Sequence, residues 1–413
     1  MSFDRCNLIC NKADPLKLVS DGFEWSDSSW IEYRRRAYCR FESCELNIYE
    51  LDPTRFFPPN GCFDIKVACD AIAAYSKKMG YTHLELPASS LENPQMFVNF
   101  MHESGIGVIA KIDIHFMTSM CQGERFDLFE LVSRFHFDGV HISGKSFAAS
   151  DFSDRINFSA RSLAEDVLVI ADEDLGNFDA DFFCNLPWTK ELYNFLSGEH
   201  NDDVIERVLQ AASDPMKIAP MSHSGSAESY GMLIDRIKGD YDDKFRIART
   251  AVLLEMCMPA KKLTFMGTEY AQFASADAAK PLEWFMLDFS KHHDFREYIL
   301  SLNNFYLEHR ELSAGGYRRL NARSFEKKSD IVAFERAIDE RNKLIIVLSF
   351  ADFDTRVAVD ISADGEPKIL FDTCGENACV YSPVIHNDTL HLFMPRKSGI
   401  VLTFDNKIIE LYL

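Results

Sequence analysis

The amino-acid sequence predicts an α/β protein, a (β/α)8 TIM barrel followed by a small all-β C-terminal domain. Two observations carry this prediction. Eight short apolar runs alternate with helical segments between residues 46 and 267, and eight parallel strands are the number that closes into a barrel. From about residue 316, apolar residues instead recur at every second position. An open doubly wound sheet is the alternative, but the glycine-rich phosphate loops that often accompany it do not occur in this sequence.

The predicted barrel strands are short apolar runs, most of them separated by helical segments. In chain order they are LNIYE (46–50), THLEL (82–86), GVIAKIDI (107–114), GVHIS (139–143), VLVIA (167–171), FDADFF (178–183), KIAPMS (217–222) and KLTFMG (262–267). The segment 65–80 illustrates the helical spacing, because Ile65, Ala68 and Ile72 share one face of a helix.

The last hundred residues predict an antiparallel β-sandwich. The runs DIVAFERAI, KLIIVLSFA, TRVAVDIS, PKILFDT, TLHLFMP and GIVLTF alternate with period two and are separated by turn signals such as ADG and KSG. A helix over 295–312 with an apolar stripe joins this part to the barrel. The predicted domains are therefore the barrel over 1–315 and the sandwich over 316–413.

Composition restricts the classes of partner. With 44 basic and 64 acidic residues the net charge is −20, which argues against nucleic acid or an anionic membrane surface as a partner. No apolar run reaches the roughly 20 residues that span a bilayer, and the first residues do not resemble a signal peptide, so we expect a soluble cytoplasmic protein. The 11 cysteines lack zinc-site spacing, so no metal or cofactor is expected.

The carboxyl ends of the strands should hold the candidate site, because a (β/α)8 barrel builds its active site there. The polar residues at these ends are Asp113, His115, His141, Ser143, Asp172, Glu173, Asp174, Ser222, His223, Ser224 and Glu269. Glycoside hydrolysis normally needs two carboxylates across the scissile bond. Here the acidic residues gather on the fifth strand and are missing from its neighbours.

A series of motifs runs in order from about residue 45 to the C-terminus. They are ELNIYELDP, YSKKMGYTHLELPA, GIGVIAKIDIHF, FDGVHISG, VLVIADED, KIAPMSHSGSAESYGMLIDRIKGDYDDKF and MGTEYAQF, the last followed by PLEWFMLDFSKHHDFREYILSLNNFYLEHREL. This succession resembles the 1,4-α-glucan branching enzymes, members of the α-amylase superfamily (glycoside hydrolase family 13). The resemblance implies the barrel fold, a place in glycogen or starch metabolism, and an α-glucan as ligand.

The resemblance also implies which positions of the fourth and fifth strands should carry the chemistry. The fourth-strand motif of that family has an Arg followed two residues later by the nucleophilic Asp, and this chain has His141 and Ser143 there. The fifth strand of the family supplies the acid/base Glu after an Ala. Asp172 takes that place, one methylene shorter, with Glu173 next to it.

Further departures affect the third and seventh strands. The Asp that opens the third-strand motif is replaced by Lys111, although His115 remains, in an alignment that needs a one-residue deletion. The His-Asp pair of the seventh strand becomes His223 and Ser224. The family's long excursion after the third strand is reduced to about two dozen residues before Asp138. The chain is also expected to be too short for the family's N-terminal carbohydrate-binding module.

These replacements lead us to expect a catalytically inactive pseudoenzyme that binds an α-glucan or regulates another enzyme of glycogen metabolism. A retaining glycosidase cannot form its covalent intermediate without the nucleophilic carboxylate. The alternative is a glycoside-active enzyme with a relocated centre that uses Asp172 or Glu173. The predicted ligand-pocket residues are His115, His223, Glu173 and Glu269.

Overall fold

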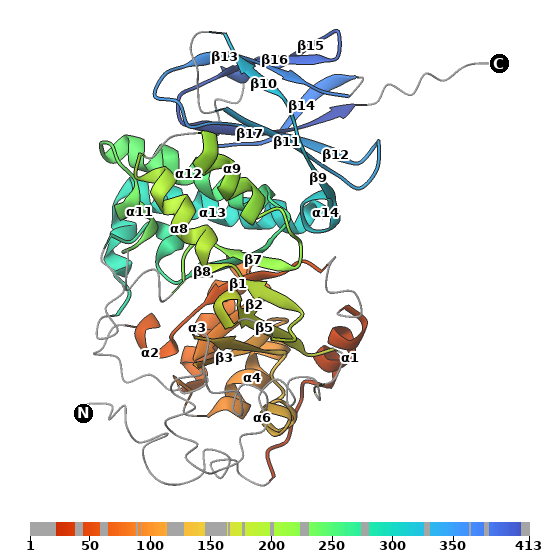
Figure 1. Cartoon of the computed structure of the whole chain (residues 1–413). Coiled ribbons are helices and arrows are strands. Elements are labelled where there is room, and N and C mark those ends of the chain that lie inside the picture. Colours follow the sequence, from red (N-terminus) through yellow and green to blue (C-terminus); the bar gives the residue numbers. More distant parts are fainter. Residues whose placement is uncertain are drawn as a thin grey trace, which may run out of the picture.

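The protein folds as a closed parallel barrel with two antiparallel sheets after it (Figure 1). The computed structural model describes residues 22–37, 44–57, 65–87, 90–91, 93–113, 128–144, 163, 166–175, 178–198, 202–223, 231–273, 281–325, 331–362, 365–375 and 380–405. The eight barrel strands pair in chain order, and β1 closes the ring against β8. The predicted fold class is confirmed.

Each barrel strand lies within, or within one residue of, the apolar run that predicts it. The strands are β1 (Asn47–Glu50), β2 (His83–Pro87), β3 (Gly107–Asp113), β4 (Gly139–Ser143), β5 (Leu168–Asp172), β6 (Phe182–Cys184), β7 (Lys217–Pro220) and β8 (Lys261–Phe265). Strand β6 is shorter than predicted, because the acidic stretch before Phe182 is not paired. Side chains alternate between the barrel interior and the surrounding helices, as the two-residue period of a strand requires.

Helices of the described residues surround the barrel. They are α1 (Ser28–Ala37), α2 (Pro53–Phe56), α3 (Ile65–Lys78), α4 (Pro94–Glu103), α6 (Leu128–Phe135), α8 (Leu186–Leu196), α9 (Asp202–Ala211), α11 (Leu233–Arg236), α12 (Tyr241–Cys257), α13 (Ser290–Glu308) and α14 (Arg310–Ala314). Short 3-10 turns accompany them, among them η4 (Glu173–Leu175), η5 (Thr268–Tyr270) and η6 (Trp284–Asp288).

Local sequence signals begin and end several of these helices. The side chain of Asn93 accepts a hydrogen bond from the backbone N–H of Met96, and Pro94 follows it, which fixes the start of α4. Asp240 caps α12 in the same way. The buried ammonium of Lys262 donates to the carbonyl of Glu255 in the last turn of α12 and to two carbonyls just beyond the helix. Lys262 of β8 therefore satisfies carbonyl groups at and just after the C-terminal end of α12.

The C-terminal part consists of two stacked antiparallel sheets. One contains β10 (Ala322–Ser324), β13 (Thr355–Asp360), β16 (Thr389–Met394) and β15 (Val384–His386), in that order. The other contains β14 (Glu366–Asp372), β17 (Ser398–Asp405), β12 (Lys343–Ser349), β11 (Ile331–Ala337) and β9 (Gly316–Arg319). A separate apolar core, including Val347, Val357 and Leu402, fills the space between them.

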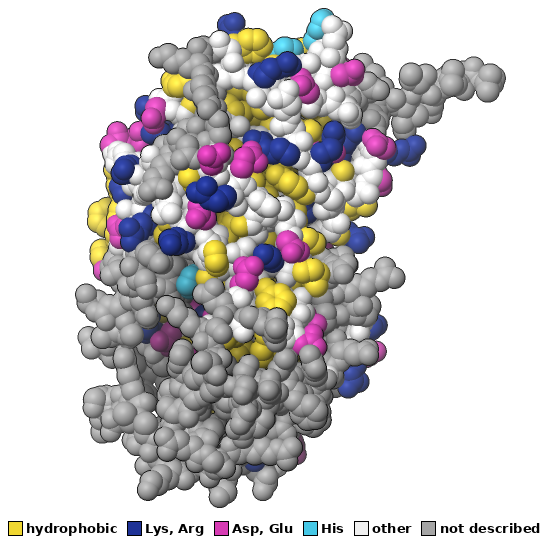
Figure 2. All heavy atoms as spheres, viewed as in Figure 1, with side chains coloured by type: hydrophobic (Ala, Val, Ile, Leu, Met, Phe, Trp, Pro, Cys, Tyr) yellow, Lys and Arg dark blue, Asp and Glu magenta, His cyan; other side chains and the backbone are white. Residues whose placement is uncertain are grey.

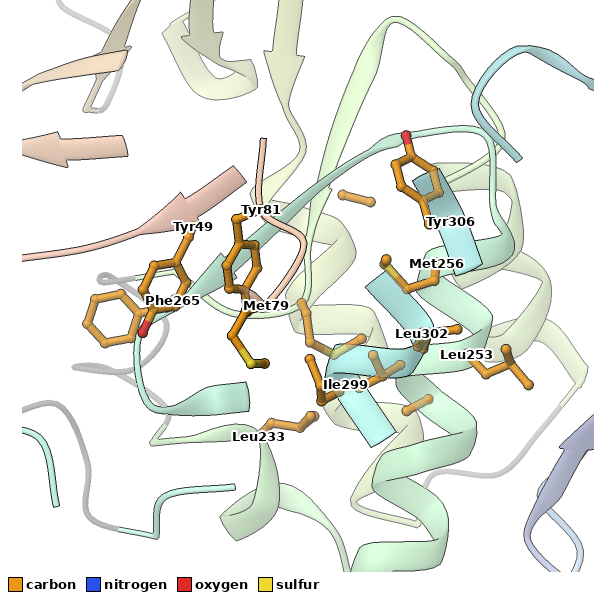
Figure 3. Close-up of a cluster of buried hydrophobic side chains, with 14 of the residues drawn as sticks. Tyr49, Met79, Tyr81, Leu233, Leu253, Met256, Phe265, Ile299, Leu302 and Tyr306 are labelled. Atoms are coloured by element: carbon orange, nitrogen blue, oxygen red, sulfur yellow. The ribbon is translucent and has the colours of Figure 1, made fainter. Parts of the chain in front are cut away.

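The five-stranded sheet packs on the barrel through α12 and α13, which lie beneath it in Figure 1. Figure 3 shows part of the shared core, in which Leu253 and Met256 of α12 lie against Ile299 and Leu302 of α13. The buried guanidinium of Arg336 crosses the junction and donates to carbonyls of Cys257, Leu312 and Gly315. Barrel helices and sheet therefore share one continuous interior.

Candidate functional site

A layer of ionisable side chains fills the carboxyl end of the barrel interior. Strands β1 to β5 each contribute one of them: Glu50, Glu85, Lys111, His141 and Asp172. Their inward direction follows from the apolar residues between them. Val140 and Ile142 of β4, for example, face outward into an apolar cluster, so that His141 faces inward. Beneath this layer lies an apolar cluster that includes Ile48, Ile109 and Ile170.

Lys111 connects the first three strands. Its ammonium nitrogen lies 2.6 Å from Oε1 of Glu50 and 3.3 Å from Oε1 of Glu85. Burial alone would lower the pKa of Lys111, but these two carboxylates raise it well above its usual value. Burial would raise the pKa of Glu85, yet His141 and Lys111 hold it well below the ordinary glutamate range. Lys111 and Glu85 are therefore both charged at neutral pH.

His141 is the bridge between the second and fifth strands. Its Nδ1 lies 2.9 Å from Oε2 of Glu85, and its Nε2 lies 3.1 Å from Oδ1 of Asp172. Because both ring nitrogens face carboxylate oxygens, both must donate, and the ring is an imidazolium. Burial opposes this charge, but Glu85 and Asp172 raise the pKa of His141 to about 9.

Asp172 is held on both of its oxygens. Oδ1 accepts from His141, and Oδ2 accepts the backbone N–H of Gly144 at 2.8 Å. Burial would raise the pKa of Asp172, but His141 and Lys111 lower it, so this carboxylate stays ionised. The residue is only 5% exposed.

Ser143 lies at the end of β4, with its hydroxyl 3.4 Å from the carbonyl of Ile112 on β3. Asp113 is its partner in the β3–β4 register. Gly139 begins the same strand, where a Cβ atom would come within 2.8 Å of Cβ of Leu168 on β5. The close contact between β4 and β5 thus requires glycine at 139.

Two other predicted site residues, Glu173 and Glu269, lie away from the layer around Asp172. Glu173 follows β5 and pairs with Lys217 at 2.7 Å, away from the His141 bridge. Glu269 lies outside the barrel strands, fully buried, where it accepts from the hydroxyls of Tyr49 and Tyr75 at 2.7 and 2.8 Å. Its neighbours show that it supports the packing of α3 on β1 and does not line the layer around Asp172.

His223 follows β7 and is half-buried. Burial lowers its pKa to about 4, although Glu50 opposes the shift, so its imidazole is neutral at pH 7. His115 and Ser224, both predicted to belong to this site, lie outside the described residues.

Three residues of this layer, Glu50, Glu85 and Cys184, are not among those predicted from the sequence. Glu50 and Glu85 could have been found, because each stands at the inward position near the end of a predicted strand, like His141 and Asp172. Cys184 is the register partner of Asp172 on β6, which only the strand pairing reveals. The donor atoms of His141, Asp172 and Cys184 all lie within 4.8 Å of one another, so these three could hold a metal ion.

Comparisons of the fold define the class of the protein. The structure superimposes on an α-amylase from Anoxybacillus with a TM-score of 0.67 at 13% identity, covering 89% of this chain and 99% of that one. An α-amylase from Geobacillus thermoleovorans, complexed with acarbose, gives a TM-score of 0.62 at 14% identity over 89% and 99% of the two chains. The fold is therefore that of the α-amylases.

Comparisons of sequence point to a narrower group. The chain is 23% identical over 477 residues to the 1,4-alpha-glucan branching enzyme of Protochlamydia amoebophila, covering 90% of this chain and 61% of that protein. It is 24% identical over 470 residues to the branching enzyme of Oceanobacillus iheyensis, covering 86% and 73%. No protein-family profile matches the chain. The chain is thus a branching-enzyme-like protein with the α-amylase fold.

The chain spans 61% and 60% of the length of two such branching enzymes, those of P. amoebophila and Nitrosomonas eutropha. None of the helices in the described ranges combines the length and the apolar character that a bilayer crossing requires.

Proposed function

We propose that this chain is a catalytically inactive α-glucan-binding protein, a pseudoenzyme built on a branching-enzyme-like barrel. The observation that carries the proposal is the imidazole of His141, which lies between the carboxylates of Glu85 and Asp172. In a glycosidase the space between two catalytic carboxylates holds the glycosidic bond. Here a side chain of the protein fills the space between these two.

The position that the resemblance gives to the nucleophile supports the same proposal. A retaining glycosidase forms a bond between a carboxylate and the sugar, whereas Ser143 offers a hydroxyl. The hydroxyl faces the carbonyl of Ile112, which can accept its hydrogen bond but is not a base. A serine without a base is a poor nucleophile.

The protonation state of Asp172 is also wrong for a general acid. A general acid must be protonated at working pH, and glycosidases keep it so by raising its pKa. The contacts of Asp172 with the His141 imidazolium and the N–H of Gly144 both favour the ionised form. Asp172 therefore serves as the counter-ion of His141.

The alternative function, glycoside chemistry at a relocated centre, has one observation in its favour. Glu85 and Asp172 are two carboxylates that face a common point, as the two carboxylates of a glycosidase do. However, Glu85 has no exposed surface, and both carboxylates are ion-paired with the same imidazolium. A sugar would have to displace His141 and separate these ion pairs before it could react.

Glucan binding is proposed from the relatives and from exposed aromatic rings near the barrel end. Phe289 is 55% exposed and Tyr241 is 43% exposed. Tyr241 stacks on Phe273, and the buried ring of His292 contacts both Phe273 and Phe289, so His292 connects Tyr241, Phe273 and Phe289 into one patch. Aromatic faces of this kind stack on the C–H groups of pyranose rings.

Affinity electrophoresis in gels that contain glycogen or dextran tests this proposal. We expect glycogen to retard the protein and dextran to leave its mobility unchanged. The double variant Tyr241→Ala/Phe289→Ala should be retarded less. Phe325→Ala is the matched control, since Phe325 is 63% exposed on the C-terminal sheets and lies outside the patch. A wild-type mobility that glycogen leaves unchanged would refute the proposed binding, and equal retardation of the two variants would refute the role of the patch.

A further inference from the structure

Three strands bring a set of metal-ligating atoms together inside the barrel. His141 comes from β4, Asp172 from the end of β5, and Cys184 from the end of β6. Asp172 and Cys184 are register partners, so their side chains point to the same side of the sheet. His141 reaches the same place from the neighbouring strand, as its 3.1 Å contact with Asp172 shows.

These three donors match the preferences of zinc. An imidazole nitrogen, a carboxylate oxygen and a thiolate sulfur are all common Zn²⁺ ligands, and three protein ligands with one open position is an established arrangement. The three donor atoms lie within 4.8 Å of one another. A tetrahedral zinc ion holds its ligand atoms roughly 3.3–3.8 Å apart, so the 3.1 Å contact between Nε2 of His141 and Oδ1 of Asp172 would widen slightly when the ion binds.

The surroundings of the three residues provide the outer contacts that zinc ligands usually have. A zinc-bound histidine commonly donates its second ring N–H to a carboxylate. Here Nδ1 of His141 lies 2.9 Å from Oε2 of Glu85, which leaves Nε2 toward Asp172 and Cys184. Asp172 accepts the N–H of Gly144 on Oδ2, so its Oδ1 is the oxygen that faces His141. These contacts set the orientation of two of the three ligands before any ion arrives.

The charge balance also permits a cation. Without a metal, the layer contains three carboxylates, the Lys111 ammonium and the His141 imidazolium, and Cys184 is a thiol. Binding of Zn²⁺ would displace one proton from Nε2 of His141 and one from Sγ of Cys184. Two positive charges leave and two enter, so the net charge of the buried layer is unchanged. The exchange therefore avoids the large cost of adding uncompensated charge to a protein interior.

We propose that Nε2 of His141, Oδ1 of Asp172 and Sγ of Cys184 form a zinc-binding site in the barrel interior. This inference goes beyond the proposed pseudoenzyme function and does not depend on glucan binding. The site occupies the layer where a glycosidase would hold its carboxylates, and a bound ion would tie β4, β5 and β6 together. The spacing of cysteines along the chain does not reveal this site, because its three ligands come from three different strands.

The test uses the full-length chain without any affinity tag, treated with chelator and then exposed to excess ZnCl2 before desalting. We expect one zinc per chain by elemental analysis. Replacement of zinc by Co²⁺ should give the intense near-ultraviolet charge-transfer band of a thiolate bound to cobalt. Substoichiometric zinc in the wild-type protein, or Co²⁺ binding without a thiolate band, would overturn the proposal.

Two substitutions then assign the site. Cys184→Ser should remove the cobalt–thiolate band and the retained zinc, while Cys257→Ser should change neither. Cys257 is the matched control because it is another fully buried cysteine, located at the end of α12. Glu85→Gln keeps every direct ligand and should weaken zinc binding about 10–100-fold, as loss of an outer-shell partner does. Zinc and cobalt signals that persist unchanged in Cys184→Ser and Glu85→Gln would contradict the assignment.

Discussion

At the scale of single residues, two histidines define how this protein distributes its buried charge. His141 lies between Glu85 and Asp172. His102 lies between Asp27 and Asp138, and each of these two carboxylates is 2.8 Å from a ring nitrogen of His102. In both places a ring with two donors separates two carboxylates that would otherwise repel each other, and a second cation, Lys111 or Arg34, pairs with one of them. Breaking such an arrangement leaves buried charges without partners, which is costlier than never having formed it.

We therefore expect His141→Ala to destabilise the protein by about 3–5 kcal/mol, because Glu85 and Asp172 lose their shared counter-ion. Chemical denaturation in the presence of chelator measures the change without any contribution from bound metal. His141→Gln should lose less stability than His141→Ala, since the glutamine amide can still donate a hydrogen bond to one carboxylate. His293→Ala, at an exposed position on α13, is the control. A loss below about 1 kcal/mol for His141→Ala would show that the bridge is not an important interaction.

At the scale of secondary-structure elements, the contact between β4 and β5 depends on Gly139. A Cβ atom there would approach Cβ and the carbonyl oxygen of Leu168 at 2.8 and 2.9 Å. We expect Gly139→Ala to force the strands apart and to reduce the free energy of unfolding by about 1–3 kcal/mol. Gly316→Ala is the control, since the nearest atom to its added Cβ is 3.6 Å away. Thermal unfolding of the two variants should differ, and equal melting temperatures would contradict the predicted clash.

The N-terminal helix α1 is attached to the barrel by a buried ionic cluster. Asp138 accepts from Trp30 of α1 at 2.7 Å, and its carboxylate also pairs with Arg34 and His102. Burial would lower the pKa of His102, but Asp138 and Asp27 raise it from 6.5 to about 9. The stabilisation from this shift is fully present below about pH 6.5 and is lost as the pH rises through 9.

Between pH 7 and 9 the wild-type protein should thus lose about 2 kcal/mol of stability through His102. Arg34 stays charged throughout, and burial lowers the pKa of the neighbouring His83 to about 4, so neither residue titrates in this range. In His102→Gln this loss of stability should be smaller by about 2 kcal/mol, and the part that comes from His141, whose pKa is also raised to about 9, should remain. His293→Gln should show the full loss of the wild-type protein. Denaturation curves at pH 7, 8 and 9 measure the effect. An identical slope in the wild-type protein and His102→Gln would rule out this role for His102.

Sequence reasoning succeeds for the elements and only partly for the site. Apolar runs bounded by turn signals predict all eight barrel strands, because each strand must be buried on both faces. The outward position of Glu269 could not be predicted, since it depends on contacts with Tyr49 and Tyr75, which are distant in sequence. The bridging role of His141 depends in the same way on Glu85, 56 positions away.

At the scale of the whole molecule, the barrel and the C-terminal sheets share their interior. Arg336 on β11 donates to carbonyls at the ends of α12 and α14, and Lys397 pairs with Asp243 of α12 at 2.7 Å. Figure 2 shows that basic and acidic side chains are interspersed over the upper part of one face, so that part carries no extended patch of a single sign. Exposed ion pairs contribute little to stability, so the buried contacts hold the barrel and the C-terminal sheets together.

We expect one cooperative transition in calorimetry, with no stable C-terminal fragment released by limited proteolysis. Arg336→Lys should lower the temperature of this transition, because a lysine cannot reach three carbonyls that a planar guanidinium contacts. Arg341→Lys, at an exposed turn, should leave it unchanged. Two separate transitions, or a protease-resistant fragment beginning near residue 316, would mean that the two parts fold independently.

We propose that this barrel does not perform glycosidase chemistry, and ¹H NMR of amylose incubated with the protein tests this proposal most directly. The spectrum reports new α-1,6 linkages and new reducing ends in the same sample. We predict neither signal above that of the buffer control, for the wild-type protein and for Ser143→Asp, since one restored carboxylate leaves Asp172 paired with His141. Turnover by the wild-type protein at about 1 s⁻¹ or faster, the rate of ordinary enzymes, would contradict the account.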